Sequence, residues 1–171
     1  ESTAPALPAP ATCHPVFATP HTQSAPSTID RVLYVFPSEQ QDQVRVQLAT
    51  TLQGVVTQNL VPTADGRGRT AALEILIPDD AVRNLIRQAK IEQIYSYMQT
   101  GTRRGMQTME QSLLELIQKR LVTVPEAMSR SSRPEALLPA LERAGIPIPV
   151  TSTDGTPVAP AIASSLRVAG G

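Results

Sequence analysis

The sequence has little of several features on which other protein classes depend. Its 171 residues include one cysteine, no tryptophan and only 3% aromatic residues. The single cysteine, Cys13, cannot form an internal disulfide, which argues against a small secreted scaffold. No apolar run is long enough to span a membrane, and no basic, apolar and small-residue segment indicates a signal peptide. We therefore expect a cytoplasmic protein, in a reducing compartment, that does not insert into a membrane.

An excess of either charge is also missing. The 15 Lys and Arg residues balance 15 Asp and Glu residues, so the formal net charge is zero. A protein that holds nucleic acid through its overall field needs a basic excess. One dibasic pair, Arg103-Arg104, lies outside the expected helices, and no aromatic residues cluster around it to stack on bases. We interpret this pair as part of a solvated loop and predict no nucleic-acid partner.

Proline and charge are unevenly distributed along the chain. Six of the 16 prolines lie in residues 1–26 and four in 147–171, whereas 14 basic and 13 acidic residues lie between Asp30 and Arg143. Segments rich in Ala and Pro without apolar periodicity bury too little surface to fold. We therefore predict a disordered tail at 1–12, one domain at 13–147 and a second disordered tail at 148–171.

Local signals near the start of the domain predict a short strand and two helices. Val16-Phe17-Ala18-Thr19 is the strand candidate, and Ser27 or Thr28 is the expected cap of the first helix, which Pro37 ends. Ser38 with Gln41 resembles a capping box for a second helix that runs to about Leu52. The apolar residues of that helix recur on one face, at Val44, Leu48 and Leu52.

A hairpin and a series of helices are expected to follow. The strand-like runs 54–61 and 70–77 flank Asp65-Gly66, a strong turn signal, and so predict an antiparallel hairpin. Asp79-Asp80 then caps a helix that continues toward or into the segment 91–98. The pattern breaks at 101–105 and resumes as a helix over 106–121. Thr123-Val-Pro-Glu126 and Ser132-Arg-Pro-Glu135 resemble two further capping boxes with proline in the first turn.

The residues needed for several common chemistries are absent. A phosphate-binding P-loop requires a glycine-rich turn followed by Lys, but Lys90 and Lys119 are the only lysines and neither follows a glycine. Asp79 and Asp80 follow a strand as metal-binding acids often do, yet a helix cap is the better interpretation. Cys13, His14 and His21 have no further CxxC or HxxxH to complete a ligand set. We predict no metal site.

Four segments together resemble one protein family. They are HPVFATPHTQSAPSTIDRV (14–32), QQDQVRVQLATTLQGVVTQNLVP (40–62), AVRNLIRQ (81–88) and GMQTMEQSLLEL (105–116). In order and spacing they are similar to the C-terminal part of the type IV pilus retraction ATPases, the PilT family, over about residues 13–144. Four matches in register make the resemblance specific.

The resemblance implies a fold, an activity and partners. The fold is α/β: the remnant of a P-loop, RecA-like core, with a β-hairpin and a C-terminal cluster of helices. The family implies a subunit of a cytoplasmic homohexamer that uses ATP and magnesium to depolymerise pili for twitching motility, next to the pilus machinery at the inner membrane. Walker A and Walker B segments would precede residue 13, so we predict that this chain alone binds no cofactor and is inactive. The alternative is a non-catalytic assembly or partner-binding module, or the product of a broken gene, without ATP binding.

His21 matches the second histidine of the family's His box, and the resemblance gives it a catalytic role. In the family this imidazole lies near the terminal phosphate of the nucleotide, where a donor can stabilise developing charge. Pro15 and Pro20 replace family leucines and remove strand N–H donors, and Cys13 and Gln23 also depart from the pattern. The simpler interpretation of His21 is a loop histidine without a ligand.

AVRNLIRQ matches a family segment that the resemblance associates with retraction. Helical spacing turns Val82, Leu85, Ile86 and Ala89 inward. It also leaves an outward stripe of Asp80, Arg83, Asn84 and Arg87. We consider Arg83, Asn84 and Arg87 a candidate partner surface. The alternative is a solvated face with Asp79–Arg83 and Asp80–Asn84 pairs of little energetic weight.

The last segment, GMQTMEQSLLEL, carries no predicted chemistry. Its apolar residues recur at helical spacing, and such a stripe is nearly always part of a core. They are Met106, Met109, Leu113, Leu116 and Ile117.

Overall fold

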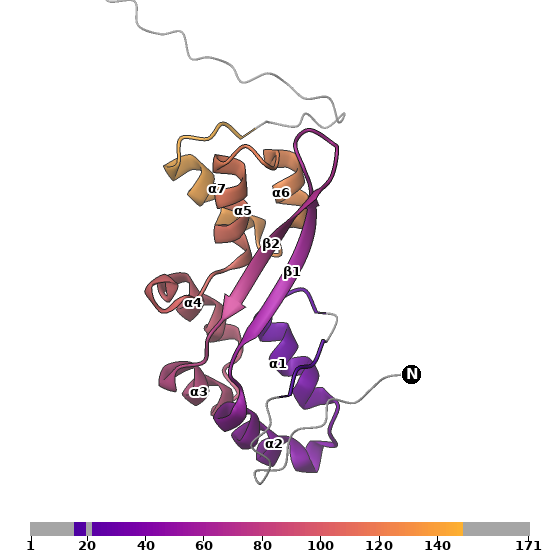
Figure 1. Ribbon diagram of the computed structural model, residues 1–171. Helices are drawn as coiled ribbons and strands as arrows, with labels where there is room; N and C mark the ends of the chain where they lie inside the picture. Colours follow the sequence, from indigo (N-terminus) through magenta and orange to yellow (C-terminus); the bar gives the residue numbers. More distant parts are fainter. Residues whose placement is uncertain (1–15, 20–21, 149–171) are drawn as a thin grey trace, which may run out of the picture.

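The computed structural model describes residues 16–19 and 22–148, in which an antiparallel hairpin lies between two groups of helices (Figure 1). The first group is α1 (Ala25–Tyr34), α2 (Ser38–Thr51), α3 (Asp80–Arg87) and α4 (Glu92–Thr100). The second group is α5 (Met109–Gln118), α6 (Val124–Arg130) and α7 (Pro134–Arg143), and a 3-10 turn, Thr102–Arg104, precedes it. Helices with a small antiparallel sheet confirm the expected α/β class.

The hairpin forms where the turn signal predicts it. Strand β1 (Val55–Pro62) pairs with β2 (Arg69–Leu76), from Val55 opposite Leu76 to Pro62 opposite Arg69. Gly66 takes a positive φ of 69°, which glycine adopts without a steric penalty. The Asp65 carboxylate accepts hydrogen bonds from the Thr63 hydroxyl and the Arg67 N–H, so the turn is closed by its own side chains.

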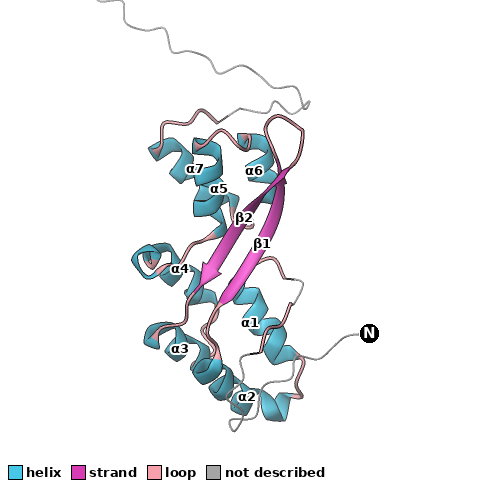
Figure 2. Cartoon of the chain, in the orientation of Figure 1, coloured by secondary structure: helices cyan, strands magenta, loops and turns pink. Residues whose placement is uncertain are grey.

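The two groups of helices lie toward opposite ends of this hairpin (Figure 2), and each group contains one hydrophobic cluster. The first cluster packs α1 to α4 around Val55 and Leu76, at the open end of the strands. The second cluster packs α5 to α7 around Val61 and Ala72, nearer the turn. Both strands therefore contribute side chains to both cores, because the inward-facing residues at one end of the hairpin lie in the first cluster and those near the turn lie in the second.

The predicted faces of α2 and α5 are confirmed. Val44 and Leu48 are buried, and Leu52 packs against their cluster. The five residues of the predicted apolar stripe are all buried, as a core position requires. They are Met106, Met109, Leu113, Leu116 and Ile117.

The expected start of the first helix was wrong by a few residues. Helix α1 begins at Ala25, with Ser24 as N-cap and Ser27 as the reciprocal partner of a capping box. The Thr28 hydroxyl instead donates to the Ser24 carbonyl. The cap lies earlier because Pro26, in the first turn, suits a helix start and lacks the N–H that an interior position needs.

The three predicted capping boxes do not form. Pro37 occupies the N-cap of α2, and Gln41 donates instead to the Phe36 carbonyl. Thr123 is the N-cap of α6 without a side-chain bond. The N-cap of α7 is Arg133, whose N–H donates to the Glu110 carboxylate at 3.2 Å. A carboxylate from α5 therefore binds the N–H of the N-cap residue, and no side chain caps the N–H groups of the first turn of α7.

The predicted strand at 16–19 is also wrong. These residues are neither helix nor strand, and Val16 and Phe17 are 56% and 93% exposed. Prolines at 15 and 20 remove two backbone donors, which explains why so short a segment pairs with no strand in the described part of the chain. The predicted tail 1–12 and residues 149–171 of the predicted tail 148–171 lie outside the described residues. Ile148, the first residue of that second tail, is described and packs against the second cluster.

Candidate functional site

Helix α3 carries the candidate partner surface and begins at a well-formed cap. Asp79 is its N-cap, and the Asp79 carboxylate accepts a hydrogen bond from the Val82 N–H at 3.0 Å. This confirms the interpretation of Asp79 as a helix cap. Val82 and Ile86 are fully buried and Leu85 is half-buried, as the helical spacing predicts.

Ala89 does not face inward with them. Helix α3 ends at Arg87, and Ala89 takes a left-handed conformation, with φ of 57°, and is exposed. The chain then turns and starts α4 at Glu92, so 80–100 forms two helices rather than one continuous helix. The extension of the helical pattern to Ala89 was therefore wrong.

Arg83 is held by another helix instead of facing solvent. Its Nη1 atom donates to the carbonyls of Ala49, at 2.5 Å, and Thr50, at 2.8 Å, and its Nη2 atom donates to the Leu52 carbonyl at 3.1 Å. These carbonyls end α2, where the last turn of a helix lacks intrahelical partners and carries partial negative charge. Arg83 therefore caps α2 and fastens α3 to it. The predicted Asp79–Arg83 side-chain pair does not form, because both groups have other partners.

The remaining residues of the predicted stripe are exposed. Asp80, Asn84 and Arg87 lie on the outer face of α3, and Asn84 accepts a hydrogen bond from Gln88 at 3.2 Å. The structure therefore places two of the three candidate partner residues on an accessible face and the third in a contact between helices.

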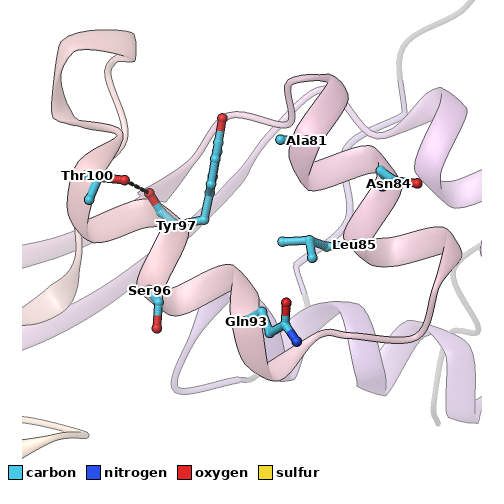
Figure 3. A pocket seen from close by; sticks show the side chains of 7 residues that line it. All are labelled: Ala81, Asn84, Leu85, Gln93, Ser96, Tyr97 and Thr100. Carbon is cyan, nitrogen blue, oxygen red and sulfur yellow. Dashed lines mark hydrogen bonds between the residues drawn. The ribbon is translucent and has the colours of Figure 1, made fainter.

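An open groove of about 510 Å³ separates α3 from α4 (Figure 3). Ala81 and Leu85 supply apolar surface from α3, and the other side chains are largely polar. The groove residues are Ala81, Asn84, Leu85, Gln93, Ser96, Tyr97 and Thr100. Asn84, from the predicted surface, thus joins a concave surface that the sequence did not indicate, because α4 contributes most of its polar groups.

A polar cluster holds the two walls of this groove together. The Tyr97 hydroxyl donates to the second oxygen of Asp79 at 2.6 Å, and the Arg104 guanidinium bonds to both groups. Burial alone would raise the pKa of Asp79. Hydrogen bonds from Tyr97 and the Val82 N–H, together with the Arg104 charge, outweigh burial and lower that pKa below its usual value. Arg103 and Arg104 are exposed, in agreement with the predicted solvated loop, but Arg104 is also paired with Asp79, which the sequence did not indicate.

Two buried carboxylates lie between the hydrophobic clusters. Glu74, on β2, is 1% exposed and Glu110, on α5, is 4% exposed. Glu110 accepts hydrogen bonds from the Tyr95 hydroxyl at 2.8 Å and the Ser131 hydroxyl at 2.9 Å, and the Arg133 guanidinium lies over the Tyr95 ring. Sequence reasoning missed both residues. One signal was present, since Glu74 occupies the buried phase of the β2 alternation.

The surroundings of Glu74 oppose its charged form. Burial raises the pKa of Glu74 and repulsion from Glu110 adds to the effect, although the N–H groups of Ala25 and Met109 and the Arg133 charge lower it. Burial and the bond to Glu110 also raise the pKa of Tyr95.

The candidate catalytic residue His21 lies outside the described residues, as do Cys13 and His14. The segment directly after His21 is described: the Thr22 and Thr28 hydroxyls are 2.5 Å apart, and Ser24 caps α1. Across residues 16–19 and 22–148, no three His, Cys, Asp or Glu side chains are grouped to hold a metal ion. No helix in that part of the chain is long and apolar enough to cross a membrane.

Comparison with known proteins gives one consistent match. The model of the type II/IV secretion system protein family matches residues 1–129. A twitching motility protein of Neisseria gonorrhoeae is 48% identical over 132 residues, which are 77% of this chain and 35% of that protein. The type IV pilus retraction ATPase PilT of Pseudomonas aeruginosa is 47% identical over 130 residues, 76% of this chain and 38% of that protein.

A solved structure agrees with these relatives. The crystal structure of the pilus retraction motor PilT with bound ADP superposes with a TM-score of 0.62 at 44% identity, and the match covers 70% of this chain and 33% of that one. The chain thus spans little more than a third of the length of the relatives that it matches.

Proposed function

Since this chain belongs to the type II/IV secretion system protein family, we propose that it is the C-terminal part of an ATPase that depolymerises type IV pili and so drives twitching motility. The observation that carries this proposal is 47–48% identity to twitching and retraction proteins over about three quarters of the chain. The four segments that resemble the family occur in the family's order, and 70% of the chain superposes on a retraction motor.

The residues of this chain do not fit a nucleotide by themselves. Lys119 pairs with Glu115 on α5, and Lys90 is exposed in the turn between α3 and α4, so neither lysine follows a glycine-rich phosphate loop. We propose that the P-loop and the magnesium-binding acids belong to other parts of the intact ATPase. This chain contributes His21 as a donor near the terminal phosphate, and the 171-residue chain alone neither binds nor hydrolyses ATP.

The exposed face of α3 contributes the contact with a partner. Asn84 and Arg87 are accessible, and Asn84 lies beside the polar wall of the groove formed by α4. Arg83 serves this surface indirectly, because it fixes α3 on the end of α2. The proposed partners are a neighbouring subunit of a homohexamer and the pilus machinery at the cytoplasmic face of the inner membrane.

The test is a chimaera in which residues 13–144 replace the matching segment of the gonococcal twitching motility protein. The chimaera is expected to restore twitching to cells that lack that protein and to hydrolyse ATP. Changing His21→Ala in the chimaera should abolish turnover while leaving assembly intact, and His14→Ala is the matched control. A folded chimaera that neither hydrolyses ATP nor restores twitching would contradict the proposal.

A second candidate function follows from the accessible face of α3, where Asn84 and Arg87 are exposed. As a separate protein the chain would act as a non-catalytic module that binds subunits of the motor. Coexpression with an intact retraction ATPase tests this second candidate, because such a module enters mixed hexamers, whereas a product that binds no subunit does not. The purified 171-residue chain should hydrolyse no ATP under either candidate function. Magnesium-dependent ATP turnover that disappears in His21→Ala would contradict this prediction.

A further inference from the structure

The Glu110 carboxylate binds to parts of the chain on both sides of it. Its Oε2 atom accepts a hydrogen bond from the Tyr95 hydroxyl at 2.8 Å. Its Oε1 atom accepts from the Ser131 hydroxyl at 2.9 Å and from the Arg133 N–H at 3.2 Å. Tyr95 lies on α4, whereas Ser131 is the C-cap of α6 and Arg133 is the N-cap of α7. One side chain on α5 therefore bonds both to α4 and to the α6–α7 junction, residues 131–133.

The residues around this carboxylate also contact one another. The Arg133 guanidinium lies over the Tyr95 ring, 4.0 Å from the ring centroid, where a cation is attracted to the electron-rich face. The Arg133 N–H also donates to the Ser131 hydroxyl oxygen at 3.1 Å. Helix α4 thus meets the start of α7 directly as well as through Glu110.

Burial makes these hydrogen bonds costly to break. Glu110 is 4% exposed and Tyr95 is 6% exposed. A buried carboxylate or hydroxyl that loses its partner has no water to replace it, so its separation is unfavourable. Apolar contacts are non-directional, whereas hydrogen bonds weaken steeply as their angle departs from linear. Directed bonds therefore set the position of α4 relative to the α6–α7 junction.

Tyr95 belongs to the helix that forms the polar wall of the groove. Ser96, Tyr97 and Thr100 follow it on α4 and line the groove (Figure 3). Tyr95 does not line the groove, and its hydroxyl bonds to α5 instead. Glu110 can therefore act on the groove through α4 without touching what the groove contains.

We propose that Glu110 is a positioning residue, which fixes the α4 wall of the groove relative to the α6–α7 junction and so sets the shape of the surface that meets a partner protein. This role rests on the proposed function, because the shape of the groove matters to motility only if this face of the molecule meets a partner. Asn84 would contact that partner, whereas Glu110 acts at a distance through the Tyr95 hydroxyl.

The first test compares two serines at the end of α6 by amide NMR of the isotope-labelled 171-residue chain. Ser131→Ala removes one donor to Glu110 and should shift the amide signals of Ser96 and Thr100 in the groove wall. Ser129→Ala is the matched control, because the Ser129 hydroxyl donates to a carbonyl of its own helix at 2.8 Å. The control should leave the groove signals in place.

The Tyr95 hydroxyl should carry this response. In a Tyr95→Phe background the shift caused by Ser131→Ala should fall by about half or more, since α4 has lost its bond to Glu110. Tyr34→Phe removes the hydroxyl of an exposed tyrosine on α1 and should keep the full response.

Groove signals that do not move in Ser131→Ala, or that move equally in Ser129→Ala, would overturn the proposal. A response of the same size in the Tyr95→Phe background would also overturn it. If Tyr95→Phe fails to fold, the comparison of the two serine variants still decides the question.

The second test measures twitching and ATP turnover in the gonococcal chimaera. Tyr95→Phe is expected to reduce twitching at least about fivefold, with little change in kcat and with hexamers intact, whereas Tyr34→Phe changes neither. An unmodified chimaera without turnover would contradict the proposed function. In an active chimaera, normal twitching with Tyr95→Phe would overturn only the role of Glu110. A joint loss of twitching and turnover would do the same, because it indicates a purely structural contact.

Discussion

Helices α3 and α5 both carry segments shared with the family, yet they are built in opposite ways. Six of the ten residues of α5 are buried, among them Met109, Leu113 and Ile117. Only Val82 and Ile86 are buried among the eight residues of α3. Helix α5 is held by packing, whereas α3 depends on polar contacts at its sides and its start. A shared segment therefore indicates a core in one place and a presented surface in the other.

The largest expected effect comes from truncating the same residue type in each helix. Leu113→Ala in α5 removes a fully buried side chain and should lower the free energy of unfolding by about 3 kcal/mol. Leu85→Ala in α3 affects a half-buried side chain and should cost about 1 kcal/mol. Chemical denaturation of both variants measures the difference. Equal losses would show that α3 depends on packing as much as α5 does.

A smaller effect on stability is expected at Arg83, and Arg87 provides the control variant. Arg83→Ala leaves three carbonyls at the end of α2 without their donor and should cost about 1–2 kcal/mol. Arg87→Ala, on the exposed face of the same helix, should change stability by less than about 0.5 kcal/mol. Arg83→Lys keeps the charge but loses the fork of donors, so an intermediate value is expected. If Arg83→Ala leaves the free energy of unfolding unchanged, Arg83 is a solvated residue, as the alternative interpretation held.

The two regions should also respond oppositely to pH. The lowered pKa of Asp79 means that its carboxylate stabilises the fold above its usual value of 3.8, and this contribution is lost as pH falls through the folded pKa. The raised pKa of Glu74 means that stability is greatest below its usual value of 4.5 and is lost as pH rises through the folded pKa.

Unfolding free energies between pH 3 and 8 test both signs. Glu74→Gln should remove the loss of stability on the rise above pH 4.5, and Asp79→Asn should remove the loss below pH 3.8. Exposed Glu115→Gln is the reference. If either variant differs from the unmodified chain in the opposite direction, the assigned cause of the pH dependence is contradicted.

The smallest effect on stability is expected at the presented surface itself. Asn84→Ala with Arg87→Ala removes exposed polar groups and places a better helix former at both positions, so the unfolding free energy should hardly change. In the chimaera the same pair should abolish twitching and spare assembly and basal ATP turnover. Normal twitching would show that this face of α3 is only solvated.

The sequence by itself determined the elements whose signals are local. Asp65-Gly66 predicts the hairpin, Asp79 predicts the start of α3, and the stripe from Met109 to Ile117 predicts a buried helix. Each of these signals depends on residues within a few positions of one another, where backbone geometry alone sets which side chains meet. The same locality allowed the four segments of the family to be recognised in order.

Only the tertiary structure decided which distant groups complete one another. Arg83 caps a helix more than 30 positions earlier, Arg104 joins Asp79 across 25 positions, and Glu74 accepts a hydrogen bond from the Ala25 N–H, 49 positions earlier. For the same reason the predicted capping box at Ser132–Glu135 does not form, and the Arg133 N–H donates to the buried carboxylate of Glu110 on α5. A polar side chain bonds to the unpaired donor or acceptor that the packing of the two cores brings close to it. Periodicity along the sequence does not show which distant residues will meet in this way.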